Sequence, residues 1–306
     1  MACLFTAEFI ARFDADDIAY PNRFSTQIDY LKTHPSCQAV SSAYIRIDEN
    51  DRPVGDKRIP PPVEEADASW IPCREPFLMQ TLLMVRKSAL DAIHGYRLCE
   101  VSEDSDLYWR LNELGEMHNL DEVLGAYRLN ANGISSKSII NGRRMAFWSQ
   151  LVGISALRRK NGLIDIRFDK SRLSSYQQAV TLEEFCRMGS DELSKEELVR
   201  LKIASSVKLL QFASYRPFEL DGSDCSFIRQ SISDGDHLLS VENRKLIYGD
   251  ITTTGFRLIR KGRVAEAYLL LQLRMPYVFV IGILRILVPK SIRPMLKKVI
   301  RRIVIR

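Results

Sequence analysis

The sequence predicts a mixed α/β fold over residues 1–135, followed by a helical region and a basic C-terminal tail. In the first segment, short apolar runs typical of strands alternate with stretches of helical periodicity. Residues 136–254 carry mainly helical patterns, and residues 255–306 combine apolar with basic residues. Of the 306 residues, 46% are hydrophobic and 27% are charged, which is enough apolar material for a sizeable core.

The first elements can be placed between residues 9 and 47. A strand over 9–13 ends at an acidic run, Asp14–Asp17. Pro21 opens a helix, because proline is tolerated in a first helical turn, and that helix ends before Pro35. A second strand is predicted over 40–47, where it runs into a polar turn.

Three further elements complete the first segment. An apolar run over 81–85 is strand-like, and a short helix over 88–93 is closed by a glycine. Ser102 is placed to cap a helix that ends at Gly115. The inward face of that helix is predicted to consist of Leu107, Leu111 and Leu114.

The helical region, residues 136–254, contains one strong start motif. Ser194 and Glu197 form a capping box ahead of a row of leucines, so a helix should begin at this point. Residues 217–224 break the helical pattern. We expect a helical extension whose contribution to function the sequence leaves open.

Charge is distributed unevenly along the chain. It has 44 basic and 38 acidic residues, but residues 255–306 hold 13 basic residues and one acid, Glu266. Residues 1–254 therefore hold 31 basic and 37 acidic residues. Between 292 and 303, apolar residues recur at helical spacing opposite lysines and arginines, a pattern suited to an anionic membrane surface. The alternative is a terminal helix docked on its own domain, and nucleic acid is not expected as a partner.

Several classes of protein are excluded at this stage. The longest uncharged apolar stretch near the C-terminus, Met275–Leu284, is 10 residues long, and a membrane-spanning helix needs about 20. Residues 1–17 do not resemble a secretory signal. The six cysteines stand far apart, so reduced thiols and a cytoplasmic location are expected, without a zinc site or disulfide framework.

The first acidic cluster suggests chemistry at the end of a strand. Asp14 and Asp16 directly follow an apolar strand, and the ends of strands in open α/β sheets face the ligand crevice. Two such carboxylates suit Mg²⁺ or Mn²⁺, which prefer oxygen ligands. The structural alternative is a turn that leads into a helix N-terminus. A calcium-binding EF-hand loop is excluded, because Ala19 and Ser25 stand where that loop needs glycine and glutamate.

The second acidic cluster, Glu103–Asp106, opens a predicted helix. Acidic residues in a first turn stabilise the helix dipole, by about 0.3–1 kcal/mol each, so the cluster has a structural explanation. A carboxylate at the rim of a crevice can also accept a proton from a hydroxyl group. Taken alone, this cluster favours the structural explanation.

Together, these stretches resemble the family-2 glycosyltransferases of the GT-A fold. The resemblance covers about residues 7–135, and its specificity comes from five motifs in the expected order. These are Phe9–Ile18 with Pro21, Arg23 and Gln27; Met84–Leu90; Gly95-Tyr96; Glu103–Leu107 with Arg110-Leu111; and Asn119–Leu124 with Tyr127-Arg128. The resemblance implies a partial GT-A, Rossmann-like domain over 1–135.

The resemblance also implies roles for individual residues. Asp14 matches the first acid of the D-x-D motif, which contacts the nucleotide-sugar donor, and Asp16 matches the acid that coordinates Mg²⁺ or Mn²⁺ on its diphosphate. Asp104 matches the catalytic base, with Glu103 beside it near a glycan or lipid-linked acceptor. The implied reaction is an inverting displacement, in which the metal neutralises the departing diphosphate.

The sequence departs from this family in two places. Many relatives carry a histidine two positions after Tyr-Arg, where it completes the metal shell; this chain has Asn130, which can offer only a carbonyl oxygen. The family also places a nucleotide-binding half before the D-x-D strand, and only eight residues precede Phe9 here. We therefore expect a chain that lacks this half and is weakly active or inactive.

Three hypotheses about function follow. The first is a glycosyltransferase that acts peripherally at the inner face of the cell membrane. The second is a non-catalytic remnant or partner subunit that serves as an interaction module. The third is a haloacid-dehalogenase-like phosphohydrolase, which also places Asp-x-Asp after a strand but requires threonine or valine where this chain has Ile18.

Overall fold

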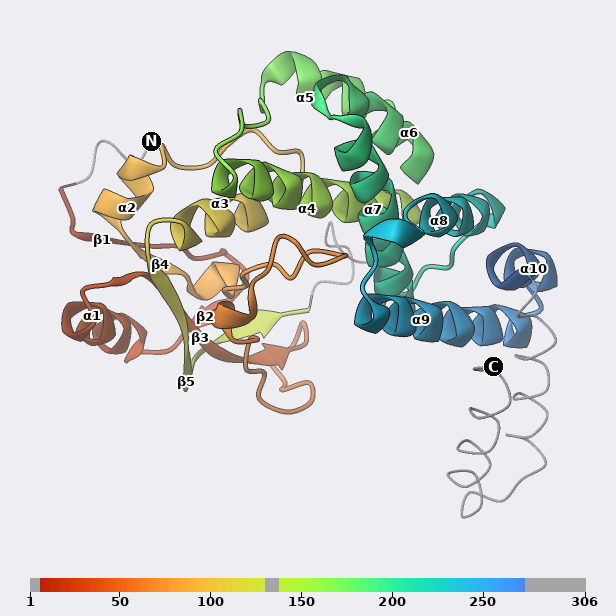
Figure 1. Cartoon of the computed structure of the whole chain (residues 1–306). Helices are drawn as coiled ribbons and strands as arrows, with labels where there is room; N and C mark the ends of the chain where they lie inside the picture. The colour runs from red at the N-terminus through yellow and green to blue at the C-terminus, as the bar shows by residue number, and fades with distance from the viewer. Residues whose placement is uncertain (1–5, 130–137, 273–306) are drawn as a thin grey trace. The chain divides into compact units, whose positions relative to one another are not determined.

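The computed structural model describes residues 6–129 and 138–272 (Figure 1). The chain forms two compact units, Met1–Phe218 and Glu219–Arg306. The first unit combines a sheet with helices, and the described part of the second unit is helical. The mixed α/β class predicted from the sequence is thereby confirmed.

A five-stranded mixed sheet, in the order β1-β4-β3-β5-β2, forms the centre of the first unit. Only β3 and β5 pair in parallel, and the other neighbours are antiparallel. The strands are β1 (Phe9–Ala11), β2 (Ile18–Ala19), β3 (Cys37–Ile47), β4 (Met84–Arg86) and β5 (Glu116–Arg128).

Helices cover this sheet and extend beyond it within the first unit. The α-helices are α1 (Arg23–Thr33), α2 (Lys87–Ala92), α3 (Glu103–Asn112), α4 (Ile139–Lys160), α5 (Lys170–Tyr176), α6 (Leu182–Met188) and α7 (Lys195–Tyr215). Short 3₁₀ helices are η2 (Val63–Glu65), η3 (Gln80–Leu82) and η4 (Ser190–Glu192). Helix α4 packs against both α3 and α7, which connects the helical region to the sheet domain.

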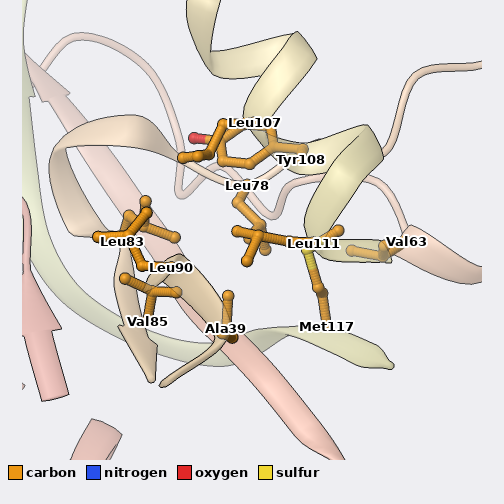
Figure 2. Packing of buried hydrophobic residues seen from close by; sticks show 11 residues of the cluster. Ala39, Val63, Leu78, Leu83, Val85, Leu90, Leu107, Tyr108, Leu111 and Met117 are labelled. Carbon is orange, nitrogen blue, oxygen red and sulfur yellow. The ribbon is translucent and has the colours of Figure 1, made fainter. Parts of the chain in front are cut away.

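The two faces of the sheet bury different helices, because successive residues of a strand point to opposite sides. Val40 and Met84 are cross-strand partners and pack with Leu31 of α1 on one face. The next pair along, Ala39 and Val85, belongs to a larger cluster on the other face. Figure 2 shows this cluster, in which Leu78, Leu83, Leu90, Leu107, Tyr108, Leu111 and Met117 gather around α3.

Close backbone packing joins the end of β5 to the core. A Cβ atom added to Gly125 would lie 2.6 Å from the carbonyl oxygen of Ile18 in β2 and 2.7 Å from a methyl carbon of Leu82. Real Cβ atoms do not approach other heavy atoms this closely, so only glycine fits here. The position holds β2, and with it the acidic segment before it, against the edge of β5.

Most of the predicted local elements are present. Helix α1 ends at Thr33, two residues before Pro35, as the sequence predicts. The capping box of Ser194 and Glu197 is formed, and each side chain bonds the backbone N–H of the other residue. Residues 216–221 separate α7 from the next helix, so the predicted break over 217–224 is present but shorter, because that helix already begins at Gly222.

Three local predictions are wrong. Thr81 lies in η3 and not in a strand, and β4 begins only at Met84. Ser102 does not cap α3 with its side chain, because its backbone adopts a left-handed conformation with φ of 61°. Leu114 is 46% exposed, because α3 ends at Asn112 and no longer directs Leu114 toward the core.

The described part of the second unit consists of three α-helices and one 3₁₀ helix. These are α8 (Gly222–Asp234), η5 (Asp236–Leu238), α9 (Val241–Arg260) and α10 (Val264–Leu271). Helix α10 packs against both α8 and α9. The predicted amphipathic stretch over 292–303 lies outside the described residues, so its association with a membrane stays a prediction.

Two sequence-based exclusions can be compared with the described residues. Cys37, Cys73, Cys99, Cys186 and Cys225 are free thiols, in agreement with the prediction. Across residues 6–129 and 138–272, no helix combines the length and the apolar character that crossing a bilayer requires.

Candidate functional site

The acidic segment Asp14–Asp17 folds into a tight turn directly after β1. The backbone N–H of Asp17 donates to the carbonyl oxygen of Asp14 (3.2 Å), which closes the turn. The N–H of Asp14 donates to the hydroxyl oxygen of Thr81 (3.2 Å), which attaches the turn to η3. The turn therefore has a fixed place at the edge of the sheet.

Arg128, at the end of β5, anchors this turn from the other side. Its backbone N–H donates to the carboxylate of Asp17 (2.7 Å), and its Nε donates to the carbonyl oxygen of Asp16 (2.7 Å). Its two terminal nitrogens bond the carbonyl oxygen of Asp48 (2.8 Å) and the carboxylate of Asp51 (2.5 Å). Burial raises the pKa of Asp17, although the hydrogen bond from Arg128 opposes this effect. Asp17 is thus a structural anchor of the turn.

Asp14 and Asp16 differ in what their carboxylates contact. The carboxylate of Asp14 forms an ion pair with Nη2 of Arg12 (2.7 Å). Asp16 is exposed, and its carboxylate makes no hydrogen bond or ion pair with any residue in the described part of the chain. Asp16 therefore offers free carboxylate oxygens beside a carboxylate that is already partly neutralised.

The second acidic cluster forms the first turn of α3. Ser102 precedes it in its left-handed conformation, and Glu103 and Asp104 are the first two helical residues. Asp104 accepts a hydrogen bond from the N–H of Ser105 (2.8 Å). Burial, and then the charge of Glu103, raises the pKa of Asp104 from 3.8 to about 6. A carboxylate with such a pKa binds protons more readily than an ordinary aspartate and still ionises near neutral pH.

Asp106, in the same turn, is fully buried and fixes α3 in place. It accepts hydrogen bonds from Nε of Arg97 (3.0 Å) and from Nη2 of Arg110 (2.6 Å). Arg97 also pairs with Asp165 (2.7 Å), which follows α4. The first turn of α3 is thereby held by a network that reaches the helical region.

Arg12 interacts electrostatically with an acidic residue of each of the two clusters. Burial alone would lower its pKa, but Asp14, Tyr96 and Glu103 together raise the pKa above its usual value. One guanidinium group therefore interacts with an acid of the D-x-D turn and with the acid next to Asp104. Residues that are about 90 positions apart in the sequence therefore interact at Arg12.

A hollow of about 310 Å³ lies beside β1 and β4, and none of Asp14, Asp16, Glu103 and Asp104 lines it. Arg12 and Phe13 line it beside the D-x-D turn, and Tyr96 and Leu107 line it beside α3. The hydroxyl oxygen of Tyr96 accepts a hydrogen bond from Gln80 (3.1 Å), which holds the tyrosine at this wall. Arg12, which pairs with Asp14 and interacts with Glu103, therefore lines this hollow, whereas the predicted residues Asp14, Asp16, Glu103 and Asp104 do not. Their catalytic and binding roles remain predictions.

The residues of the D-x-D turn fit a divalent metal ion of the kind predicted. Mg²⁺ in phosphate-binding sites commonly takes one or two carboxylates together with substrate phosphates, and Mn²⁺ accepts similar oxygen ligands. The free carboxylate of Asp16 meets this requirement, with Asp14 as its neighbour. Among residues 6–129 and 138–272, no group of three or more His, Cys, Asp or Glu side chains forms a metal site by itself. Asn130 lies outside the described residues, so its predicted role as a ligand is untested.

Sequence reasoning gave no role to several residues around the hollow. Arg12 belongs to the D-x-D motif by position, yet nothing in the sequence shows that it interacts with residues some 90 positions later. Tyr96 stood out only as part of a Gly-Tyr pair. Glu75, which contacts Ser105 in the first turn of α3, and Lys208, which pairs with Glu75, carry no local pattern at all.

Comparison with known proteins relates this chain to glycosyltransferases. No protein-family model matches it. It is 33% identical over 137 residues to EpsE of Bacillus subtilis, a protein named as a glycosyltransferase, and this match covers 44% of the chain and 48% of EpsE. It is 29% identical over 135 residues to the amylovoran biosynthesis glycosyltransferase AmsE of Erwinia amylovora, covering 43% of the chain and 49% of AmsE. The chain thus spans about half the length of the curated relatives it matches.

A solved structure shows a weaker similarity. The mannosyltransferase PcManGT from Pyrobaculum calidifontis, solved in complex with GDP-Man and Mn²⁺, is 13% identical, with a TM-score of 0.38. The match covers 88% of this chain and 61% of PcManGT. A similarity at this level gives no basis for transferring function.

Proposed function

We propose that this chain carries the metal-binding turn and the catalytic base of an inverting, family-2 glycosyltransferase of the GT-A fold. The observation that carries the proposal is the position of Arg12, which forms an ion pair with Asp14 of the D-x-D turn, interacts with Glu103 beside Asp104 and lines the hollow. The names of EpsE and AmsE support the same class of enzyme. The donor would be a nucleotide-sugar, and the acceptor would be a glycan or a lipid-linked sugar.

Asp104 is the group that accepts the proton in this proposal. Its pKa of about 6 leaves it mainly ionised at pH 7 and close enough to neutrality to accept a proton from an acceptor hydroxyl group. The resulting oxygen nucleophile attacks the anomeric carbon from the face opposite the leaving diphosphate, which inverts the configuration. Glu103, next to Asp104 at the start of α3, would contact the acceptor.

The D-x-D turn, together with Arg12, would bind the donor. A divalent ion held by Asp16, with Asp14 beside it, would supply positive charge to the diphosphate. Arg12 offers a second cation, because its ion pair with Asp14 uses only one of its terminal nitrogens. Arg12 can therefore bind an anionic ligand while it remains close to Asp14.

The test is a transfer assay on the chain with a panel of nucleotide-sugars, Mn²⁺ and glycan or lipid-linked acceptors. Donor binding is measured in parallel by calorimetry, with and without a metal chelator. We expect Asp104→Asn to abolish transfer while donor affinity stays within about twofold, because the base contacts the acceptor and not the diphosphate.

Asp29→Asn is a suitable control, because Asp29 is an exposed aspartate on α1 outside the hollow. Full turnover by the Asp104→Asn variant would remove Asp104 from the role of base. A wild-type chain that neither binds nor transfers any sugar of the panel would favour the non-catalytic interaction module instead.

A further inference from the structure

Glu75 connects the helical region to the first turn of α3. Its Oε2 accepts a hydrogen bond from the hydroxyl group of Ser105 (2.6 Å), and its Oε1 accepts one from Nζ of Lys208 (2.5 Å). Ser105 follows Asp104 directly and donates its backbone N–H to the Asp104 carboxylate (2.8 Å). A continuous chain of contacts thus runs from Lys208 of α7 to the predicted base.

The pair of Glu75 and Lys208 is shielded from solvent. The side chains are 15% and 19% exposed. Burial lowers the pKa of Lys208, but the charge of Glu75 raises it above its usual value, so the lysine stays cationic. Desolvation of two ions largely offsets their attraction, and a buried ion pair of this kind is therefore a poor source of net stability. Its location beside the candidate site suggests a different role.

The electrostatic surroundings of Asp104 are mostly acidic or neutral. Glu103 in the same turn and Glu75 from the loop before η3 both raise the pKa of Asp104, after burial itself. Tyr96 and Tyr108 also interact with Asp104. Glu75 in turn faces Lys208, which also interacts with Cys73 and Tyr215. Glu75 is thus the acid outside α3 that acts on the base, and its own charge is balanced from α7.

We propose that Glu75 and Lys208 form a positioning pair through which α7 of the helical region orients the first turn of α3 and, with it, the carboxylate of Asp104. Lys208 holds Glu75, and Glu75 holds the hydroxyl group of Ser105. Neither side chain needs to touch the substrate. This inference rests on the proposed function for its catalytic consequence, but the effect on Asp104 can be measured without substrate.

The first experiment measures the pKa of Asp104 in the full chain by NMR, with ¹³C-labelled aspartate and the Asp104→Asn variant to assign the resonance. Glu75→Gln removes one negative charge, so we expect the pKa of Asp104 to fall, by up to about one unit. The double variant Glu75→Gln/Lys208→Met should show a smaller fall, because it also removes the positive charge of Lys208, and it leaves no unpaired charge that could prevent folding. An unchanged pKa in both variants would overturn the proposal, whether or not the chain transfers sugar.

The second experiment separates positioning from general stability. Lys208→Met should lower kcat by about ten- to hundredfold with little change in the KM for the donor, because misplacing a catalytic group by about an ångström has effects of this size. Lys208→Arg should retain most of kcat. Lys202→Met is the matched control, since it removes the same charge from another position on α7.

The outcomes distinguish the two proposals. A shift in the pKa of Asp104 in a protein without transfer activity would support the positioning pair and contradict the proposed function. Equal loss of activity in the Lys202→Met and Lys208→Met variants would indicate damage to α7 as a whole, and would overturn the positioning role.

Discussion

Replacement of Asp104 by asparagine should make the folded protein more stable near neutral pH, although it removes the proposed base. Burial and the charge of Glu103 raise the pKa of Asp104 to about 6, from 3.8. The folded state therefore binds the proton of Asp104 more tightly than the unfolded state does. The resulting contribution to stability is complete below pH 3.8 and is lost as the pH rises through 6.

The size of the effect follows from the shift in pKa. A difference of about two units corresponds to about 3 kcal/mol, at about 1.4 kcal/mol per unit, and this is the largest penalty for ionised Asp104. Asp104 is only partly buried, so solvent screens the charge and we expect a gain of about 1–2 kcal/mol for Asp104→Asn. Asparagine retains an oxygen that can accept the hydrogen bond from Ser105.

The assay is urea unfolding of wild type and Asp104→Asn between pH 4 and pH 8, followed by tryptophan fluorescence. Trp70, Trp109 and Trp148 are the three tryptophans of the chain, and all belong to the first unit, which contains Asp104. The difference in free energy of unfolding should be near zero at pH 4 and should grow to a plateau above pH 7. A difference that does not change with pH would refute the electrostatic reasoning, and Asp29→Asn should show no such trend.

Three further predictions concern the metal-binding turn and the fold. Asp16→Ala should weaken metal-dependent donor binding by about tenfold or more, as measured by calorimetry; equal affinities with and without the carboxylate would exclude Asp16 as a ligand. Gly125→Ala should lower the free energy of unfolding by about 1–3 kcal/mol, because the added Cβ atom forces β2 away from β5. The control, Gly249→Ala, lies in an open position on α9 and should raise the free energy of unfolding slightly. Asp106→Ala should cost about 3 kcal/mol in a denaturant titration, because two arginines lose their buried partner; a neutral result would show that Arg97 and Arg110 reach solvent instead.

The sequence predicts those parts of the fold that depend on neighbouring residues. Helix α1 and the capping box before α7 are set by proline, by side-chain caps and by apolar spacing, all of which act within a few residues. The prediction for Ser102 is wrong because it used only the local pattern. That pattern favours a cap, but Ser102 has a left-handed backbone at the start of α3. Thr81 likewise has strand propensity, yet η3 uses its hydroxyl group to hold the turn at Asp14.

The candidate site is predictable only in its acidic residues. Asp14, Asp16 and Asp104 stand in recognisable motifs, whereas the residues that set their electrostatic surroundings do not. Glu75 and Lys208 are 133 positions apart in the sequence. They come together in a structure in which α7 packs against α4, and α4 packs against α3. Contacts of this kind follow from tertiary packing, on which a single sequence carries no local information.

The attachment of Arg128 to two carbonyl oxygens and two carboxylates has a consequence for ligand binding. Because Arg128 ties the turn at Asp16 and Asp17 to β5 and to the loop at Asp48 and Asp51, the D-x-D turn is preorganised. An incoming divalent cation would meet carboxylates that already have their final backbone geometry, so little conformational entropy remains to be lost there. Adaptation to different anionic ligands would then fall to the side chain of Arg12.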